Sequence, residues 1–161
     1  MTGTSEMLRT YHNAVMQTRL TGPTYFEPIL RRFLGIVKEQ NKIYAQLYYI
    51  LVILTDGCIH DMAITKSLVV EMSYLPISII IVGIGDENFA MMEELDADKV
   101  VLKTKEGYVA ARDICQFVRF SRMHELAKVE VAEHLLQEVP HHFVDYMVLK
   151  TILEKERTTP S

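Results

Sequence analysis

The residues of this 161-residue chain that could do chemistry stand where predicted strands end. Asp56 directly follows a hydrophobic run, in the sequence Leu54-Thr55-Asp56-Gly57. Ligands of an open parallel sheet bind outside the carboxyl ends of its strands, where a carboxylate is exposed to the crevice. Asp56 is therefore a candidate cation ligand. The alternative that it only caps a turn stays open at this point.

A second run ends in Gly83-Ile84-Gly85-Asp86. A glycine pair after a strand is typical of dinucleotide-binding loops, but Asn88 stands where the third glycine of such a loop would be. We therefore favour a close backbone turn over a cofactor site.

The motifs of the common catalytic sites are missing from the sequence. It has no G-x-S-x-G elbow, no H-E-x-x-H and no P-loop lysine. Cys58 and Cys115 are too far apart in the chain for a clustered zinc site, which favours two reduced and mostly buried thiols. The expected activity is non-enzymatic.

Three of the six histidines are candidate metal ligands. His60 is four residues from Asp56 and could reach a metal there, but a solvated loop histidine is favoured. His141 and His142 follow Pro140 at a predicted helix start. Because adjacent residues point to different sides of a helix, these two histidines suit a surface better than a shared metal.

Two hydrophobic runs predict neighbouring strands of a parallel sheet. Residues 47–54 and 77–82 lack polar alternation and are rich in β-branched residues, which is typical of strands buried on both faces. Between them, Asp61 is placed to cap a helix that runs to about Tyr74. Its predicted inward face is Ile64, Leu68, Val69 and Met72. Strand, helix and strand together form a βαβ unit.

The remaining predicted elements flank this unit. They are helices over residues 5–17 (capped by Thr4 or Ser5), 26–40, 87–95, 123–137 and 143–153, and a strand over residues 99–102. Residues 111–120 fit either a strand or a helix. The sequence thus predicts one α/β domain over residues 1–150, with a mostly parallel sheet and flanking helices. A polar tail is expected over residues 151–161, frayed from Glu154 onward.

Composition narrows the classes of partner. The net charge is only −4 and the basic residues are scattered, which argues against nucleic acid. The apolar runs are far shorter than the roughly 20 residues that cross a bilayer, so direct membrane insertion is not expected. The first residues contain no apolar signal core, which predicts a cytoplasmic protein.

Taken in order, several stretches resemble the copine family. These stretches are residues 22–29, 54–57, 75–85, 92–96, 111–118 and 136–140, so the resemblance covers about residues 5–147. The run Pro-Ile-Ser-Ile-Ile-Ile-Val-Gly followed by Met-Glu-Glu-Leu-Asp is specific to copine-type von Willebrand factor A domains. The resemblance implies a doubly wound, Rossmann-like sheet that binds protein partners and is not an enzyme.

The resemblance also implies a metal site. In that family a metal-ion-dependent adhesion site holds Mg²⁺ or Mn²⁺ through an Asp-x-Ser-x-Ser loop, a threonine of a second loop and an aspartate of a third. By motif, Thr24 in Gly-Pro-Thr matches the second loop and Asp56 in Thr-Asp-Gly matches the third. Oxygen ligands of this kind are those that Mg²⁺ prefers. With the family pattern, metal binding becomes the preferred interpretation of Asp56.

The departures from the family pattern limit these expectations. The chain contains no Asp-x-Ser-x-Ser, which the family carries on a first strand upstream, and no counterpart of the paired C2 domains. The domain is therefore expected to be truncated at its N-terminal side. Because only two of the family's five side-chain ligands are present, we expect Mg²⁺ or Mn²⁺ to bind with roughly millimolar or weaker affinity. Recruitment to membranes is expected only through other domains or partners.

A structural expectation follows from the family's sheet order. The missing strand would lie beside residues 47–54, so these residues are predicted to form an apolar edge that invites self-association.

The leading interpretation is a protein-interaction module that docks through the face with Thr24 and Asp56. One alternative is a regulatory or truncated copine fragment without independent metal binding. Another is the substrate-binding piece of a ubiquitin-ligase system, because some plant ligases pair a copine-type A domain with a RING. Two cysteines cannot build a RING, so ligase activity would have to reside elsewhere.

Overall fold

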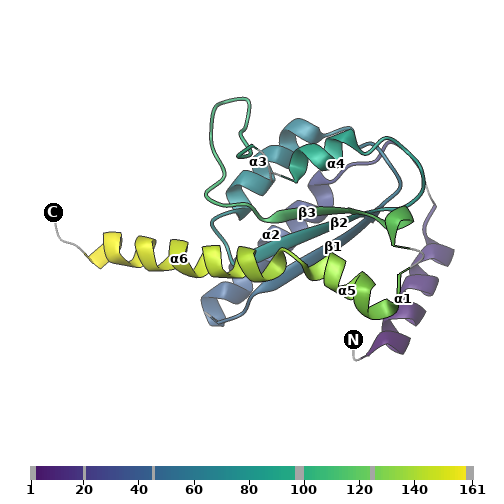
Figure 1. The fold of residues 1–161 in the computed structure, drawn as a ribbon, viewed down its shortest axis with the longest axis horizontal. Coiled ribbons are helices and arrows are strands. Elements are labelled where there is room, and N and C mark those ends of the chain that lie inside the picture. Colours follow the sequence, from purple (N-terminus) through teal and green to yellow (C-terminus); the bar gives the residue numbers. More distant parts are fainter. Residues whose placement is uncertain (1–2, 20, 45, 97–99, 124–125, 159–161) are drawn as a thin grey trace.

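Three parallel strands with helices on both faces form the protein in a computed structural model, which describes residues 3–19, 21–44, 46–96, 100–123 and 126–158 (Figure 1). The elements in chain order are α1 (Thr4–Gln17), α2 (Glu27–Ile43), β1 (Tyr49–Thr55), α3 (Met62–Met72), β2 (Ile77–Gly83), α4 (Ala90–Leu95), β3 (Cys115–Arg119), a 3₁₀ turn (Phe120–Arg122), α5 (Lys128–Leu136) and α6 (Val139–Thr158). The predicted α/β class is confirmed.

The sheet has the order β1-β2-β3, and both pairs of strands are parallel. Tyr49 of β1 is level with Ile77 of β2, and Ile79 of β2 is level with Cys115 of β3. The predicted βαβ unit is therefore confirmed, with α3 as its crossover. The segment 111–120, which fitted either state, supplies β3.

The central strand β2 is buried along its whole length. Its side chains alternate between two layers, because successive residues of a strand point to opposite faces. Ile77, Ile79 and Ile81 pack into the core that α2, α3 and α4 share. Ile80 and Val82 pack on the other face, against residues of α5 and its flanks. The prediction of burial on both faces is correct for this strand.

The same prediction is wrong for β1. Tyr49, Leu51 and Ile53 pack against the main core, but the alternate residues are open to solvent. The exposed fractions of Ile50, Val52 and Leu54 are 44%, 53% and 64%. The reason lies in the second helical layer. The residues of α5 and its flanks pack around Ile80 and Val82 of β2 and leave this face of β1 uncovered.

The backbone of β1 is also open on one side. The N–H of Tyr49 donates to the carbonyl of Pro76, and the carbonyl of Thr55 accepts from the N–H of Ile84, at 2.8 Å each. Backbone groups of successive strand residues point to alternate edges. Those of Ile50, Val52 and Leu54 thus point away from β2, to the edge where the described residues supply no further strand.

Asp61 precedes α3, as predicted, but it serves another helix. Its carboxylate accepts the N–H groups of Phe26 at 3.0 Å and Glu27 at 2.6 Å, so it caps α2. On α3 itself, Ile64 was predicted to face inward but is exposed, and its neighbour Thr65 is buried instead. Leu68, Val69 and Met72 are buried as expected.

The termini of several helices differ from the prediction. Gly3, and neither Thr4 nor Ser5, occupies the N-cap of α1, and α4 begins only at Ala90. Of the predicted strand over residues 99–102, Lys99 lies outside the described residues, and residues 100–102 form no strand. A short antiparallel bridge joins Lys103 and Val109 instead.

The last two helices are also displaced. In the described part of the predicted helix 123–137, α5 begins at Lys128. Pro140 lies in the first turn of α6, where its missing N–H leaves no helical hydrogen bond unmade. The helix continues to Thr158, so residues 151–158 of the predicted polar tail are helical. Among the described helices, none combines the length and the hydrophobicity needed to span a bilayer.

The loop after β2 is a close backbone turn, as favoured above. A Cβ on Gly83 would lie 2.8 Å from the ring of Phe89 and 3.0 Å from that of Phe117, and Gly85 has a φ of +92°. Gly83 thus allows close packing of the two rings, and Gly85 allows the chain to turn.

We expect Gly83→Ala to lower the free energy of unfolding by about 1–3 kcal/mol, because the added methyl would overlap the buried ring of Phe89 and the partly buried ring of Phe117. Gly35→Ala is the matched control. A Cβ there meets nothing within 4 Å on the exposed side of α2, so this change should stabilise by about 0.5–1 kcal/mol. Urea denaturation measures both. Equal midpoints for Gly83→Ala and the unchanged protein would contradict the packing.

Candidate functional site

The predicted ligands Thr24 and Asp56 both lie at the carboxyl end of β1. Asp56 follows the last residue of the strand, and Thr24 lies in the loop before α2. Both residues are exposed. The carbonyl of Thr24 accepts the N–H of His60 at 2.9 Å, which joins the two loops that carry the predicted ligands.

Two further contacts hold these loops together. The rings of Tyr25 and His60 meet edge to face with centroids 6.3 Å apart, and the Asp61 carboxylate caps α2. His60 is exposed, as expected of a loop histidine. The tertiary structure therefore brings the second and third loops side by side. That Thr24 and Asp56 share a metal ion stays a prediction.

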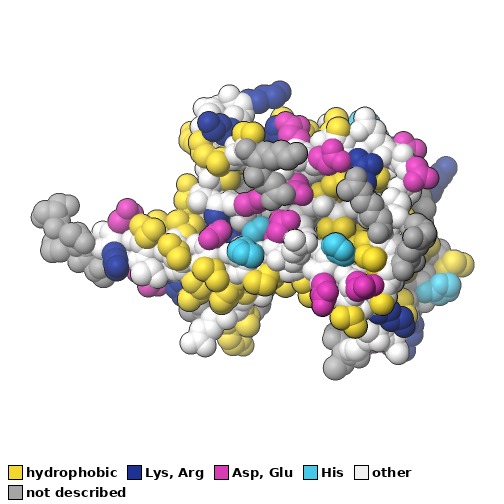
Figure 2. Space-filling view, in the orientation of Figure 1, with side chains coloured by type: hydrophobic (Ala, Val, Ile, Leu, Met, Phe, Trp, Pro, Cys, Tyr) yellow, Lys and Arg dark blue, Asp and Glu magenta, His cyan; other side chains and the backbone are white. Residues whose placement is uncertain are grey.

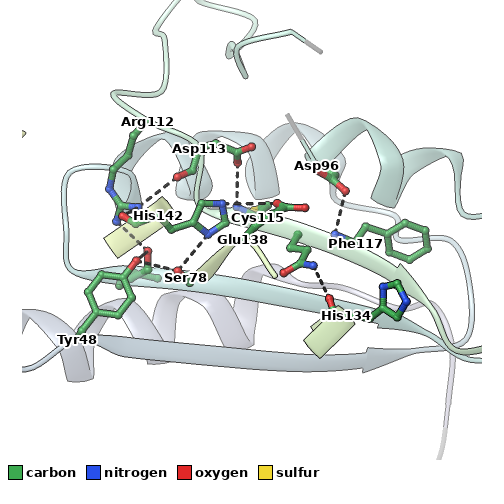
Figure 3. A network of polar contacts seen from close by, with 12 residues as sticks. Tyr48, Ser78, Asp96, Arg112, Asp113, Cys115, Phe117, His134, Glu138 and His142 are labelled. Carbon is green, nitrogen blue, oxygen red and sulfur yellow. Dashed lines mark hydrogen bonds and ion pairs between the residues drawn. The ribbon is translucent and has the colours of Figure 1, made fainter. Parts of the chain in front are cut away.

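A second group of polar residues lies at the opposite, amino end of the sheet (Figure 3). Tyr48 precedes β1, Ser78 is the second residue of β2, and Asp113 precedes β3. Glu138 directly precedes α6, and His142 lies in its first turn. Parallel strands that begin at the same edge place these residues together, although they are up to 94 positions apart in the chain (Tyr48 to His142).

Arg112 is buried at the centre of this group. Its guanidinium donates to four backbone carbonyls: Leu75 at 2.5 Å, Ile77 at 2.8 Å, His142 at 3.1 Å and Asp113 at 3.2 Å. It also stacks over Tyr146, 5.5 Å from the ring centroid. One side chain thus joins the chain before β2, the chain before β3 and the first turn of α6.

Burial sets the electrostatics of this region. It lowers the pKa of the Arg112 guanidinium from its ordinary value, an effect that the nearby Tyr48 and Asp145 oppose. Burial likewise raises the pKa of Tyr146. It raises the pKa of the Cys115 thiol well above its ordinary value, and the charge of Asp113 acts in the same direction. Cys115 is therefore a protonated core residue.

The expectation of two mostly buried thiols is half right. Both cysteines are free, but Cys58 is exposed.

His142 is buried, contrary to the prediction from the sequence. It was expected on the surface with His141, yet only 4% of it is exposed, whereas His141 is exposed. Its Nδ1 lies 3.1 Å from the Ser78 hydroxyl, and its Nε2 lies 3.7 Å from a carboxylate oxygen of Glu138. The hydroxyl of Ser78 in turn lies 2.7 Å from that of Tyr48.

Serine, histidine and glutamate in this order are similar to a hydrolase triad. Ser78, however, is completely buried within β2, and Tyr48 covers its hydroxyl. An acyl group from solvent cannot reach this oxygen, so the arrangement does not support acyl transfer.

Across the part of the chain that the structure describes, one group of three side chains has the spacing of metal ligands: Asp113, Glu138 and His142. One ligand atom from each lies within 4.8 Å of the others. The spacing of Glu138 and His142, four residues apart, could have indicated this pair, because such residues share a helix face. Nothing in the local sequence indicates Asp113, which only the sheet brings to them.

Comparison with known proteins shows what the chain is similar to. A family model described as Copine matches residues 1–155. The chain is also 38% identical over 160 residues to Protein BONZAI 2 of Arabidopsis thaliana. This alignment covers 99% of the chain but 27% of that relative, so the chain spans about a quarter of its length.

We expect Arg112→Lys to lower the free energy of unfolding by about 3 kcal/mol. A single ammonium cannot reach carbonyls on three segments, and buried carbonyls left without a donor are costly. Arg31→Lys serves as control, because its ion pair with Glu27 is on the surface and should contribute less than about 0.5 kcal/mol. Guanidinium denaturation compares the two. Similar losses for both variants would contradict the role of Arg112.

Proposed function

Because the chain belongs to the copine family, we propose that it is a cytoplasmic protein-interaction module and not an enzyme. The observation that carries the proposal is the extent of apolar surface that the fold leaves open. Contiguous exposed apolar side chains on a folded protein mark sites where another protein binds.

Three elements each expose apolar side chains of their own. On β1, the uncovered face and the open backbone edge belong to the same residues, Ile50, Val52 and Leu54. On α1 the exposed apolar residues are Met7, Leu8, Tyr11, Val15 and Met16, and the helix has no buried residue. On α6, hydrophobic side chains are visible along the helix in Figure 2, and the exposed ones include Phe143, Val144, Met147, Val148 and Ile152.

The carboxyl end of the sheet offers a docking point of another kind. Thr24 and Asp56 lie exposed on two joined loops, which fits a weak Mg²⁺ or Mn²⁺ site whose remaining positions a partner's carboxylate would fill. We propose this face as the metal-dependent part of the surface.

Calorimetric titration of Mg²⁺ and Mn²⁺ tests the metal part. We expect weak binding, roughly millimolar, that Asp56→Ala abolishes because the carboxylate is lost. Asp86→Ala is the control, since Asp86 is an equally exposed carboxylate on the neighbouring loop. Equal heats for Asp56→Ala and Asp86→Ala, or no heat at all, would mean that partner binding here is independent of metal.

The open edge of β1 leads to a separate expectation, self-association through strand pairing. Sedimentation velocity over a series of concentrations should show a species larger than the monomer that grows with concentration. Val52→Lys should abolish it, because a charge on the exposed edge strand opposes pairing.

Val129→Lys is the matched control, since Val129 is exposed on α5, away from the sheet edge. A monodisperse monomer at every concentration would contradict this expectation. So would an equal loss of the larger species in both variants.

A further inference from the structure

We propose that Asp113, Glu138 and His142 form a Zn²⁺ site that ties the beginning of α6 to the chain before β3. The inference goes beyond the proposed function, because it concerns another end of the sheet and another metal. It needs neither Thr24 nor Asp56.

The spacing of the donor atoms is the first argument. The distance between His142 Nε2 and Glu138 Oε2 is 3.7 Å. A hydrogen bond between these atoms would be about 2.7–3.2 Å long. Around a tetrahedral Zn²⁺ with bonds of about 2.0–2.1 Å, neighbouring donor atoms lie about 3.4 Å apart. The pair is thus spaced more like two ligands of one ion than like a hydrogen bond. Small side-chain movements would also bring the third donor in, since all three lie within 4.8 Å.

The orientation of His142 is the second argument. Its ring is almost completely buried, and Nδ1 is engaged with the Ser78 hydroxyl, which the Tyr48 hydroxyl contacts in turn. This arrangement turns Nε2 toward the carboxylate of Glu138 (Figure 3), and a ligand atom of Asp113 lies within 4.8 Å of one from each of the other two residues. A metal-binding histidine is usually fixed in this way, by an outer partner on its other ring nitrogen. Ser78 and Tyr48 would supply that outer shell.

Asp113 is also held in place. One of its carboxylate oxygens accepts the N–H of Cys115 at 3.0 Å. Its backbone carbonyl accepts from Arg112, which also binds the carbonyl of His142. Arg112 therefore fixes two of the three ligand-bearing segments relative to each other. Its positive charge opposes a cation, but the two carboxylates outweigh it.

The donor types select the metal. One imidazole and two carboxylates suit Zn²⁺, which accepts nitrogen and oxygen ligands together. Mg²⁺ and Ca²⁺ take oxygen ligands, so an imidazole disfavours them. Three protein ligands leave a fourth position for water. We expect the bound ion to stabilise the fold, because it binds the native arrangement of three segments that are separate in the unfolded chain.

The test is a calorimetric titration of Zn²⁺ into the whole chain, with the melting temperature as a second readout. We expect one ion to bind per chain with a dissociation constant of roughly 1 μM or lower. The melting temperature should rise with the Zn²⁺ concentration. His142→Gln should weaken binding at least tenfold, and so should Glu138→Gln. The second variant is isosteric and only half-buried, so it keeps the proposal testable if the first does not fold.

His141→Gln is the matched control, because it removes an adjacent but exposed histidine. It should leave the affinity unchanged, as should Asp56→Ala. Three results would overturn the proposal: no binding at one ion per chain, an equal loss with His141→Gln, or an affinity that Glu138→Gln does not reduce. Because Asp56 and Mg²⁺ play no part in this experiment, its failure is distinct from failure of the proposed function.

Discussion

Every residue of β2 is buried, and this requirement decides how the helices are placed. A strand buried on both faces needs a layer of helices on each side, and its alternating side chains divide the hydrophobic residues between them. One layer, built by α2, α3 and α4, also covers the inner residues of β1. The other is smaller and packs around Ile80 and Val82 of β2 and Val118 of β3. This imbalance leaves the outer face of β1 exposed, and we propose that a protein partner binds to this face.

The two ends of the parallel sheet differ in chemistry. At the carboxyl end, exposed loops are joined by a few backbone contacts, with Thr24 and Asp56 open to solvent. At the amino end, polar groups are buried and must therefore be satisfied by each other. Arg112 achieves much of this by donating to four carbonyls. The carboxyl end thus suits exchange of a weakly bound ion and partner, whereas the amino end suits a fixed site that orders the fold.

Membership of the copine family and the exposed apolar surface of this chain both support the proposal of a protein partner. The chain corresponds to about a quarter of its relative in Arabidopsis thaliana. Its apolar residues on β1, α1 and α6 would be costly to leave in water if nothing covered them. On β1, the open backbone edge adds hydrogen-bonding groups beside the exposed apolar side chains. A partner that supplies a strand would satisfy both the apolar and the polar requirements at once.

The fold class, the βαβ unit and the family could be predicted from the sequence, because they depend on local hydrophobic runs and on motifs. It also placed Asp56 at the carboxyl end of the sheet, because this residue directly follows a hydrophobic strand; that Asp56 binds a metal stays a prediction. What covers each strand face depends on tertiary packing. The burial of β1 was therefore predicted wrongly, because it depends on helices that are distant in sequence. For the same reason His142 was assigned to the surface. Its burial and its carboxylate neighbour Asp113 come from strand order and helix docking, which local spacing does not contain.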